Sequence, residues 1–337
     1  TPDLNVASDS GSSTTDDITN DSTPTFNGTG APASMTVRLY VTGTLRCTTT
    51  SDGAGNWSCT SAALTDGTYS ITARALDAAG NESGDSPALS PVILDTAIPT
   101  APTSAPDVDA ASDSGSSSVD NNTSDTTPTF NGSGAPASTL IRVYAGGTQR
   151  CQVTSDVTGN YTGCTAGAAI GDGTYADAVA RSADIAGNES VNSPALAPSL
   201  VIDATAPAAP ASMPDLDAAS DSGSSNSDNN TNDTTPTFSG SGAEASSTVR
   251  LYIGGSLRCS VTADGIGSYS ACTPGVAVAE GTYVNVLVRA MDAAGNESLD
   301  SAALAPNLVI DTTAPAAPTT APDLDAASDS GSSAVDN

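Results

Sequence analysis

Apolar and polar residues alternate over short stretches of this chain. Residues 35–43 read MTVRLYVTG, in which Val37, Leu39 and Val41 alternate with polar or amphipathic side chains. A period of two residues predicts a β-strand with one buried face. Similar β-prone runs occupy residues 23–30, 44–50, 58–64, 66–77 and 90–95. The Gly-rich stretch at 51–57 separates two such runs and predicts a hairpin between 44–50 and 58–64. No segment has the helical period of 3.6 residues.

The runs recur because the whole chain is repetitive. The phrase PDLNVASDSGSS at residues 2–13 returns almost unchanged at residues 106–117, 214–225 and 322–333. A period of about 105 residues is the size of a small domain. The later copies place strands at 175–184 and 283–292 and at 199–203 and 307–311. We therefore expect repeats at 1–105, 106–213 and 214–321, and the start of a fourth at 322–337.

About seven short strands per repeat, separated by turn residues, predict an all-β fold of tandem immunoglobulin-like β-sandwich domains. Only 37% of the residues are hydrophobic, so each domain needs further stabilisation beyond a thin core. Trp57, replaced by Tyr161 and Tyr269 in the later repeats, is expected to pack over the hairpin.

The charge is strongly acidic, with 38 Asp and Glu against 9 Lys and Arg and a formal net charge of -29. Nucleic acid and anionic membrane surfaces need clustered basic residues, so neither is an expected partner. No apolar run reaches transmembrane length, so direct membrane insertion is not expected either. The sequence has no histidine or lysine to act as a general base, and we expect no enzyme activity.

The six cysteines form one closely spaced pair in each repeat. This even distribution predicts disulfides within repeats and an oxidising, extracellular compartment, secreted or at the cell surface. Reduced thiols are the alternative, and a zinc site lacks enough ligands. We expect each bond to close the hairpin rather than to join two sheets. The chain starts without methionine and stops within a repeat, which suggests an excerpt of a longer exported polypeptide. The expected pairs are Cys47–Cys59, Cys151–Cys164 and Cys259–Cys272.

Acidic residues gather in the repeated phrase and at the end of each repeat. Carboxylates this dense repel one another unless a hard cation collects their oxygens, and Ca²⁺ accepts six to eight oxygen ligands. The alternative is a solvated loop without metal. Asn5 replaces the second acid of the phrase in the first repeat, so a site there should be weaker or arranged differently. The candidate ligands are Asp3, Asp9, Asp95, Asp107, Asp109, Asp113, Asp120, Asp203, Asp215, Asp217, Asp221, Asp228, Asp311, Asp323, Asp325 and Asp329.

The spacing of these acids is constant across each linker. Asp95, Asp203 and Asp311 each precede the first acid of the next phrase by the same number of residues. A constant linker is what a site shared across a domain junction requires. Three turn acids, Asp77, Asp184 and Asp292, are weaker candidates because they can simply cap their own turns.

The recurring motifs TPTFxGxG, GNW, DGTY, DAAGNES and VIDxTAP resemble those of bacterial immunoglobulin-like repeats in large surface adhesins and biofilm-associated proteins. The resemblance covers essentially the whole chain. It implies that the domains are extender modules, often rigidified by calcium at their junctions. The paired cysteines depart from the commonest pattern of these repeats.

Three functions therefore compete. The first is a calcium-rigidified, non-catalytic extender whose partners are the neighbouring repeats of the same chain. The second is a subunit of an extracellular filament or pilus-like assembly, with lateral self-association in a fibre. The third is a glycan- or protein-binding module. Binding would require aromatic or polar clusters particular to one repeat, and the repeats differ mainly in small residues.

Overall fold

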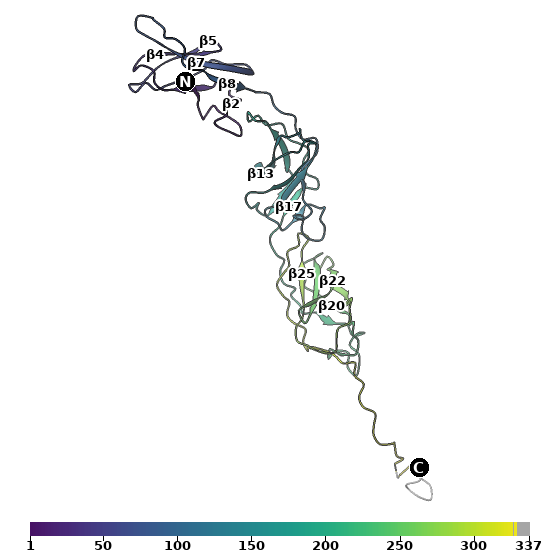
Figure 1. Ribbon diagram of the computed structural model, residues 1–337. Coiled ribbons are helices and arrows are strands. Elements are labelled where there is room, and N and C mark those ends of the chain that lie inside the picture. The colour runs from purple at the N-terminus through teal and green to yellow at the C-terminus, as the bar shows by residue number, and fades with distance from the viewer. Residues whose placement is uncertain (326, 329–337) are drawn as a thin grey trace. The chain divides into compact units, whose positions relative to one another are not determined.

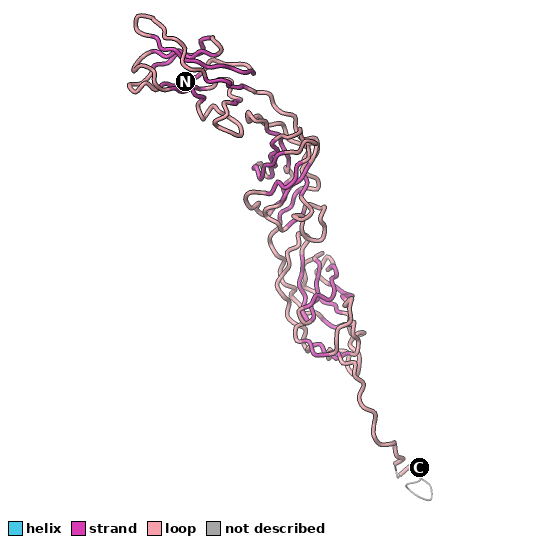
Figure 2. The backbone as a smooth tube through the Cα atoms, in the orientation of Figure 1, coloured by secondary structure: helices cyan, strands magenta, loops and turns pink. Residues whose placement is uncertain are grey.

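The computed structural model describes residues 1–325, 327 and 328, and throughout these residues it contains β-strands and loops but no helix (Figures 1 and 2). Accordingly, no helix in this part of the chain is long and apolar enough to cross a membrane. The chain divides into two compact units. The first contains residues 1–205 and 293–296, and the second contains residues 206–292 and 297–337.

The first repeat folds into two sheets. Antiparallel pairing joins β1, β3 and β6 in one sheet, and the other has the order β2-β8-β7-β4-β5. The strand β2 pairs with β8 in parallel. The strands are β1 (Asp3–Leu4), β2 (Ile18–Thr19), β3 (Thr25–Gly28), β4 (Thr36–Val41), β5 (Thr44–Thr50), β6 (Trp57–Thr60), β7 (Gly67–Leu76) and β8 (Leu89–Leu94).

The second repeat has the same arrangement with one interruption. The predicted strand at 175–184 is two strands, because the chain between them turns away and the Asp177 carboxylate accepts the N–H groups of Gly146 and Gly147. The strands are β9 (Asp107–Val108), β10 (Asn122–Thr123), β11 (Thr129–Gly132), β12 (Leu140–Ala145), β13 (Thr148–Thr154), β14 (Tyr161–Thr165), β15 (Gly173–Tyr175), β16 (Val179–Ala183) and β17 (Leu200–Ile202).

The third repeat is divided in the same way, so the predicted strand at 283–292 is also broken. The described residues therefore form eight or nine strands per repeat, several of only two residues, rather than about seven. The strands are β18 (Asp215–Leu216), β19 (Asn230–Thr231), β20 (Phe238–Gly240), β21 (Thr248–Ile253), β22 (Ser256–Thr262), β23 (Tyr269–Cys272), β24 (Gly281–Tyr283), β25 (Val286–Met291) and β26 (Leu308–Ile310).

Each repeat has its own core. The alternation predicted for residues 35–43 is confirmed, since β4 buries Val37, Leu39 and Val41. A fully buried phenylalanine lies at the centre of the facing sheet in each repeat: Phe26, Phe130 and Phe238.

An aromatic ring covers a glycine beside each phenylalanine. Trp57 of β6 lies across Gly28 of β3, its strand partner, so closely that a Cβ there would be 2.3 Å from the indole ring. Tyr161 and Tyr269 cover Gly132 and Gly240 in the same way.

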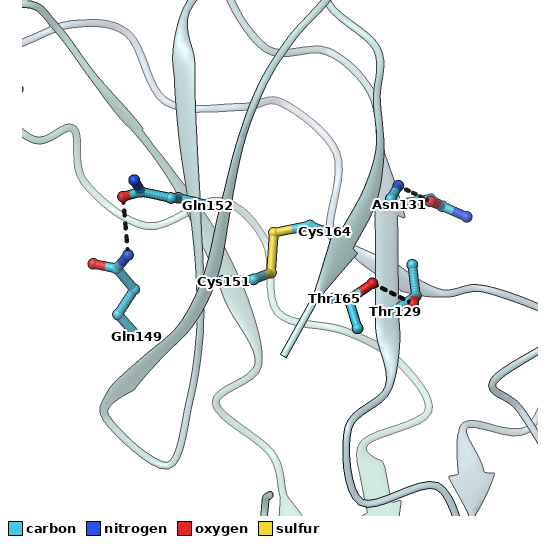
Figure 3. The surroundings of a disulfide bond; sticks show 8 residues. Thr129, Asn131, Gln149, Cys151, Gln152, Cys164 and Thr165 are labelled. Atoms are coloured by element: carbon cyan, nitrogen blue, oxygen red, sulfur yellow. Dashed lines mark hydrogen bonds between the residues drawn. A yellow bond between two sulfur atoms is a disulfide. The ribbon is translucent and has the colours of Figure 1, made fainter. Parts of the chain in front are cut away.

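The structure joins the three expected cysteine pairs, but the predicted hairpin around them is wrong. The strands β5 and β6 belong to different sheets, and so do β13 and β14 in the second repeat. Figure 3 shows Cys151 and Cys164 meeting between these two strands. The Gly-rich segment carries the chain from one sheet to the other. Each disulfide therefore ties the two layers of the sandwich together along one side.

Candidate functional site

One buried carboxylate occupies the same place in every repeat. Asp9, Asp113 and Asp221, in the acidic loop after the first strand, are only 3%, 4% and 4% exposed. In the second and third repeats, one carboxylate oxygen accepts a backbone N–H, from Asn121 or Asn229, at 3.1 Å. The other oxygen, Oδ1, has no hydrogen-bond partner among the described residues in any of the three repeats. A buried, unpaired carboxylate oxygen is costly, so this atom marks a position suited to a cation.

The loop itself is held by neutral hydrogen bonds. The N–H of each buried aspartate donates to the carbonyl four residues earlier, as from Asp113 to Asp109 at 2.9 Å. The hydroxyl of Thr123 in β10 donates to the carbonyl of Ser112, and Thr19 and Thr231 do the same in the other repeats. The loop is thereby fastened to the strand that pairs with the last strand of its own repeat.

Further acids surround the buried carboxylates. Burial raises the pKa of Asp113 above its ordinary value, and the nearby Asp120 and Asp107 carboxylates raise it further. In the first repeat, burial raises the pKa of Asp9, with Asp16 and Asp17 adding to the effect. Negative charge is therefore concentrated around Asp9 and Asp113, and no arginine is among the causes of either pKa shift.

The first repeat differs in which acids it uses. Asp17 stands where Asn121 and Asn229 stand in the other repeats, and all three adopt a positive φ near 60°. Burial raises the pKa of Asp17, and Asp3 and Asp16 raise it further. The sequence shows that Asp17 replaces the asparagine, but only the fold shows that Asp17 lies near Asp9. The first repeat therefore lacks an acid at Asn5 but has an additional one, Asp17, near the buried Asp9.

The remaining predicted acids mostly bond to their own segments. Asp95, Asp203 and Asp311 accept the N–H two residues later, at 2.9–3.1 Å. Asp109 accepts a hydrogen bond from the side chain of Asn131 on the neighbouring strand. Asp217 likewise accepts one from the hydroxyl of Ser239. Asp120 and Asp228 cap their own turns, and Asp325 accepts from Ala327. Asp3, Asp107 and Asp215 begin β1, β9 and β18, while Asp323 lies in a loop and Asp329 lies outside the described residues.

The sequence predicts that metal ligands are shared across the linker between two repeats, and the contacts of Asn121 show which segment the buried acid lies against. The buried Asp113 lies beside Asn121, which donates through its side chain to the carbonyl of Pro198 and accepts from the N–H of Val201, next to the exit strand of the same repeat. The turn acids Asp77 and Asp184 accept hydrogen bonds from Asn81 and Asn188 in their own turns. Within the described residues, no three or more His, Cys, Asp or Glu side chains are already placed to hold a metal. A cation would therefore have to draw neighbouring carboxylates toward the unpaired Oδ1.

Comparison with known proteins identifies the repeats. The family model for the bacterial Ig-like domain matches three times, at residues 1–96, 100–204 and 208–312. No curated protein sequence matches the chain.

Solved structures with similarity to the chain include three bacterial examples. A Ca²⁺-stabilized adhesin with which an Antarctic bacterium binds ice is 23% identical over 92% of this chain and 73% of that one, with a TM-score of 0.32. A 1.5-MDa bacterial ice-binding adhesin, studied for its cell-surface retention, is 20% identical over 86% and 90%, with a TM-score of 0.29. The BSP domain of a biofilm-associated protein is 20% identical over 56% and 29%, with a TM-score of 0.19.

Proposed function

The chain belongs to the family of bacterial Ig-like domains, and on that premise we propose that it is a calcium-rigidified extender segment of a bacterial adhesin or surface fibre. It is extracellular and non-catalytic, and its partners are neighbouring repeats. The observation that carries this proposal is the buried aspartate with one unpaired oxygen, found at the same place in Asp9, Asp113 and Asp221. A catalytic site would not be expected to recur in each of three similar domains.

The donor set suits calcium. Every candidate ligand is an oxygen, and Ca²⁺ accepts carboxylates together with backbone carbonyls and water at flexible geometry. In the second repeat, Asp113 would hold the ion with help from Asp120 and Asp107, the acids that raise its pKa. When bound, the ion supplies positive charge that offsets the repulsion among the carboxylates of the loop. The loop then holds one conformation, because the Asn121 side chain fastens it to Pro198, just before the last strand β17.

The disulfides support the proposed location. A cross-link between the two sheets of every repeat persists in an oxidising compartment and is rare in the cytosol. The net charge of -29 keeps such a chain soluble, and calcium reduces its self-repulsion.

Thermal unfolding in Ca²⁺ and in EDTA tests the proposal. A ligand that binds only the folded state stabilises it by about 2.7 kcal/mol at one hundred times Kd. We therefore expect millimolar Ca²⁺ to raise the melting temperature of the 337-residue chain by several degrees. An identical melting curve in EDTA and in Ca²⁺ would refute calcium binding.

A pair of variants separates a specific site from general charge screening. Asp113→Asn neutralises the buried carboxylate, whereas Asp156→Asn neutralises an exposed acid that caps its own turn. Asp113→Asn should lose one repeat's share of the rise in melting temperature that calcium produces. Asp156→Asn should keep the whole rise. Equal increments in the two variants would show that calcium acts by screening alone.

A further inference from the structure

The acidic loop of the first repeat makes close main-chain contact with a turn of the second, inside the first compact unit. The Ser10 hydroxyl donates to the carbonyl of Ala186 at 2.6 Å. A Cβ on Gly11 would lie 2.0 Å from the Ile185 carbonyl oxygen, and a Cβ on Gly187 would lie 2.8 Å from the Gly11 nitrogen. Only glycine at both positions permits this approach, because both also have positive φ angles of 96° and 93°.

A side chain from the same turn reaches back to the end of the first repeat. Asn188 donates its Nδ2 to the carbonyl of Asp95, just after the last strand β8, at 2.8 Å. Its own Asp184 accepts from it at 2.9 Å, which fixes the amide orientation. Asn188 is 9% exposed, and its hydrogen bond to Asp95 is partly buried. The turn therefore contacts both the acidic loop and the exit of the preceding repeat.

The same contacts recur at residues 293–296, which count with the first unit. Ser114 donates to the carbonyl of Ala294 at 2.6 Å, and a Cβ on Gly115 would lie 2.1 Å from the carbonyl oxygen of Ala293. Asn296 donates to the carbonyl of Asp203 at 2.7 Å. Because the two sets match residue by residue, the contact is a property of the repeat and not of one pair of neighbours.

A charged cluster holds the receiving turn in place. Glu189, which follows Asn188, accepts from Arg142 at 2.6 Å, from Tyr144 at 2.6 Å and from Arg181 at 3.1 Å. These partners lie on β12 and β16, so the turn is fastened to the sheet of its own repeat. Arg181 also stacks on the Tyr144 ring, 4.6 Å from its centroid.

We propose that two short segments form the surface by which one repeat docks on the next. The hook is the Ser-Gly pair that follows the buried aspartate, as at Ser10 and Gly11. The receptor is the turn D-x-A-G-N of the following repeat, as at residues 184–188. The partner is another repeat of this type, recognised by main-chain shape and not by charge. The turn at 77–81 in the first repeat is a free receptor, since among the described residues a Cβ on Gly80 would meet no heavy atom within 4 Å. This turn is therefore open to the hook of a further repeat.

The inference deepens the proposed extender role and rests on it for the effect of calcium. The hook residue Ser10 follows directly after the buried Asp9, and Ser114 follows Asp113. A cation that orders the aspartate would therefore order the hook beside it. The receptor contributes carbonyls and an amide to this contact, and the carboxylates of Asp184 and Glu189 hold the turn that presents them.

Two glycines at equivalent positions provide a matched test in the full chain. Gly187→Ala places a methyl group in the docked contact, whereas Gly80→Ala places one in open space at nearly the same φ of 88°. Both variants carry the same backbone strain, so their difference isolates docking. Bioorthogonal fluorophores at Thr48 and Gln152, both exposed, would report the distance distribution between the first two repeats.

We expect Gly187→Ala to broaden this distribution and Gly80→Ala to match the wild type. Equal distributions in both variants would overturn the proposal. Fluorescence of Trp57, the only tryptophan, confirms that the first repeat stays folded. Asn188→Ala against Asn81→Ala repeats the comparison without touching a glycine. Measuring all four variants in Ca²⁺ and in EDTA separates the two ideas: broadening by Gly187→Ala without any calcium effect would support docking and refute calcium control.

Discussion

Removing the disulfide of the first repeat should destabilise that repeat selectively. The bond between Cys47 and Cys59 joins strands of different sheets and closes a loop with a sequence separation of 12. In the chain-entropy model, a loop of this length contributes about 3 kcal/mol by restricting the unfolded chain. The Cys47→Ala/Cys59→Ala variant should lose about this amount. The loss of buried sulfur at Cys59 adds to it, so the figure is a lower bound.

The chain contains its own local probe for this experiment. Trp57 is the only tryptophan, lies two residues from Cys59 and is 7% exposed, so its fluorescence reports unfolding of the first repeat alone. With a urea m-value of about 1–3 kcal/mol/M, the transition midpoint should fall by about 1–3 M. The midpoint is the readout, because removing a nearby disulfide also changes the intensity.

The matched control is the same change in the second repeat. Cys151→Ala/Cys164→Ala removes an equivalent bond from a core that does not contain Trp57. Its Trp57 midpoint should stay within error of the wild type. If the Cys47→Ala/Cys59→Ala midpoint also stays unchanged, the bond does not constrain the sandwich and the reasoning fails.

Other predictions follow from the second repeat. Phe130→Ala should cost about 3–5 kcal/mol, because the ring is fully buried, and chemical denaturation with far-UV circular dichroism would show it. Burial alone would raise the pKa of Glu189, but the hydrogen bonds from Tyr144, Arg142 and Arg181 together hold it below its ordinary 4.5. The folded state therefore gains stability above pH 4.5 and loses it as the pH falls through the lowered pKa. Glu189→Gln should cost about 1 kcal/mol at pH 7 and flatten this acid-side loss, as urea midpoints across pH 3–7 would reveal; an unchanged pH profile would count against the cluster.

Local patterns in the sequence predict individual strands well and their pairing less well. The alternation around Leu39 specifies both a strand and its buried face, because side chains on a strand alternate between two environments. The residues between Thr50 and Trp57 look like a hairpin loop, yet they connect two sheets. Spacing alone does not distinguish a return within one sheet from a crossing between two, since both need a short Gly-rich segment.

The candidate site divides in the same way. Composition and repetition single out Asp9, Asp113 and Asp221 as potential ligands, but burial of one carboxylate per loop depends on how the loop folds back on β2, β10 or β19. The docking contact leaves a weaker signal. Gly11 and Gly187 stand in recurring phrases, but nothing in either phrase pairs them. Their relation lies in main-chain geometry, which glycine permits without encoding a partner.

The parallel pairing of β2 with β8 determines how a repeat responds to mechanical tension. A pull on β8 from the C-terminal side and on β2 from the N-terminal side draws these strands in opposite directions along their length. Ile18 and Thr19 then resist in shear together with Ile93 and Leu94, instead of separating one bond at a time. The strand β1 pairs with β3 through only two residues and should separate early. Tension from the N-terminal side then reaches β2 through the acidic loop. The loop around Asp9 lies between β1 and β2, so it comes under tension once β1 separates from β3, and an ion bound there would then share the load.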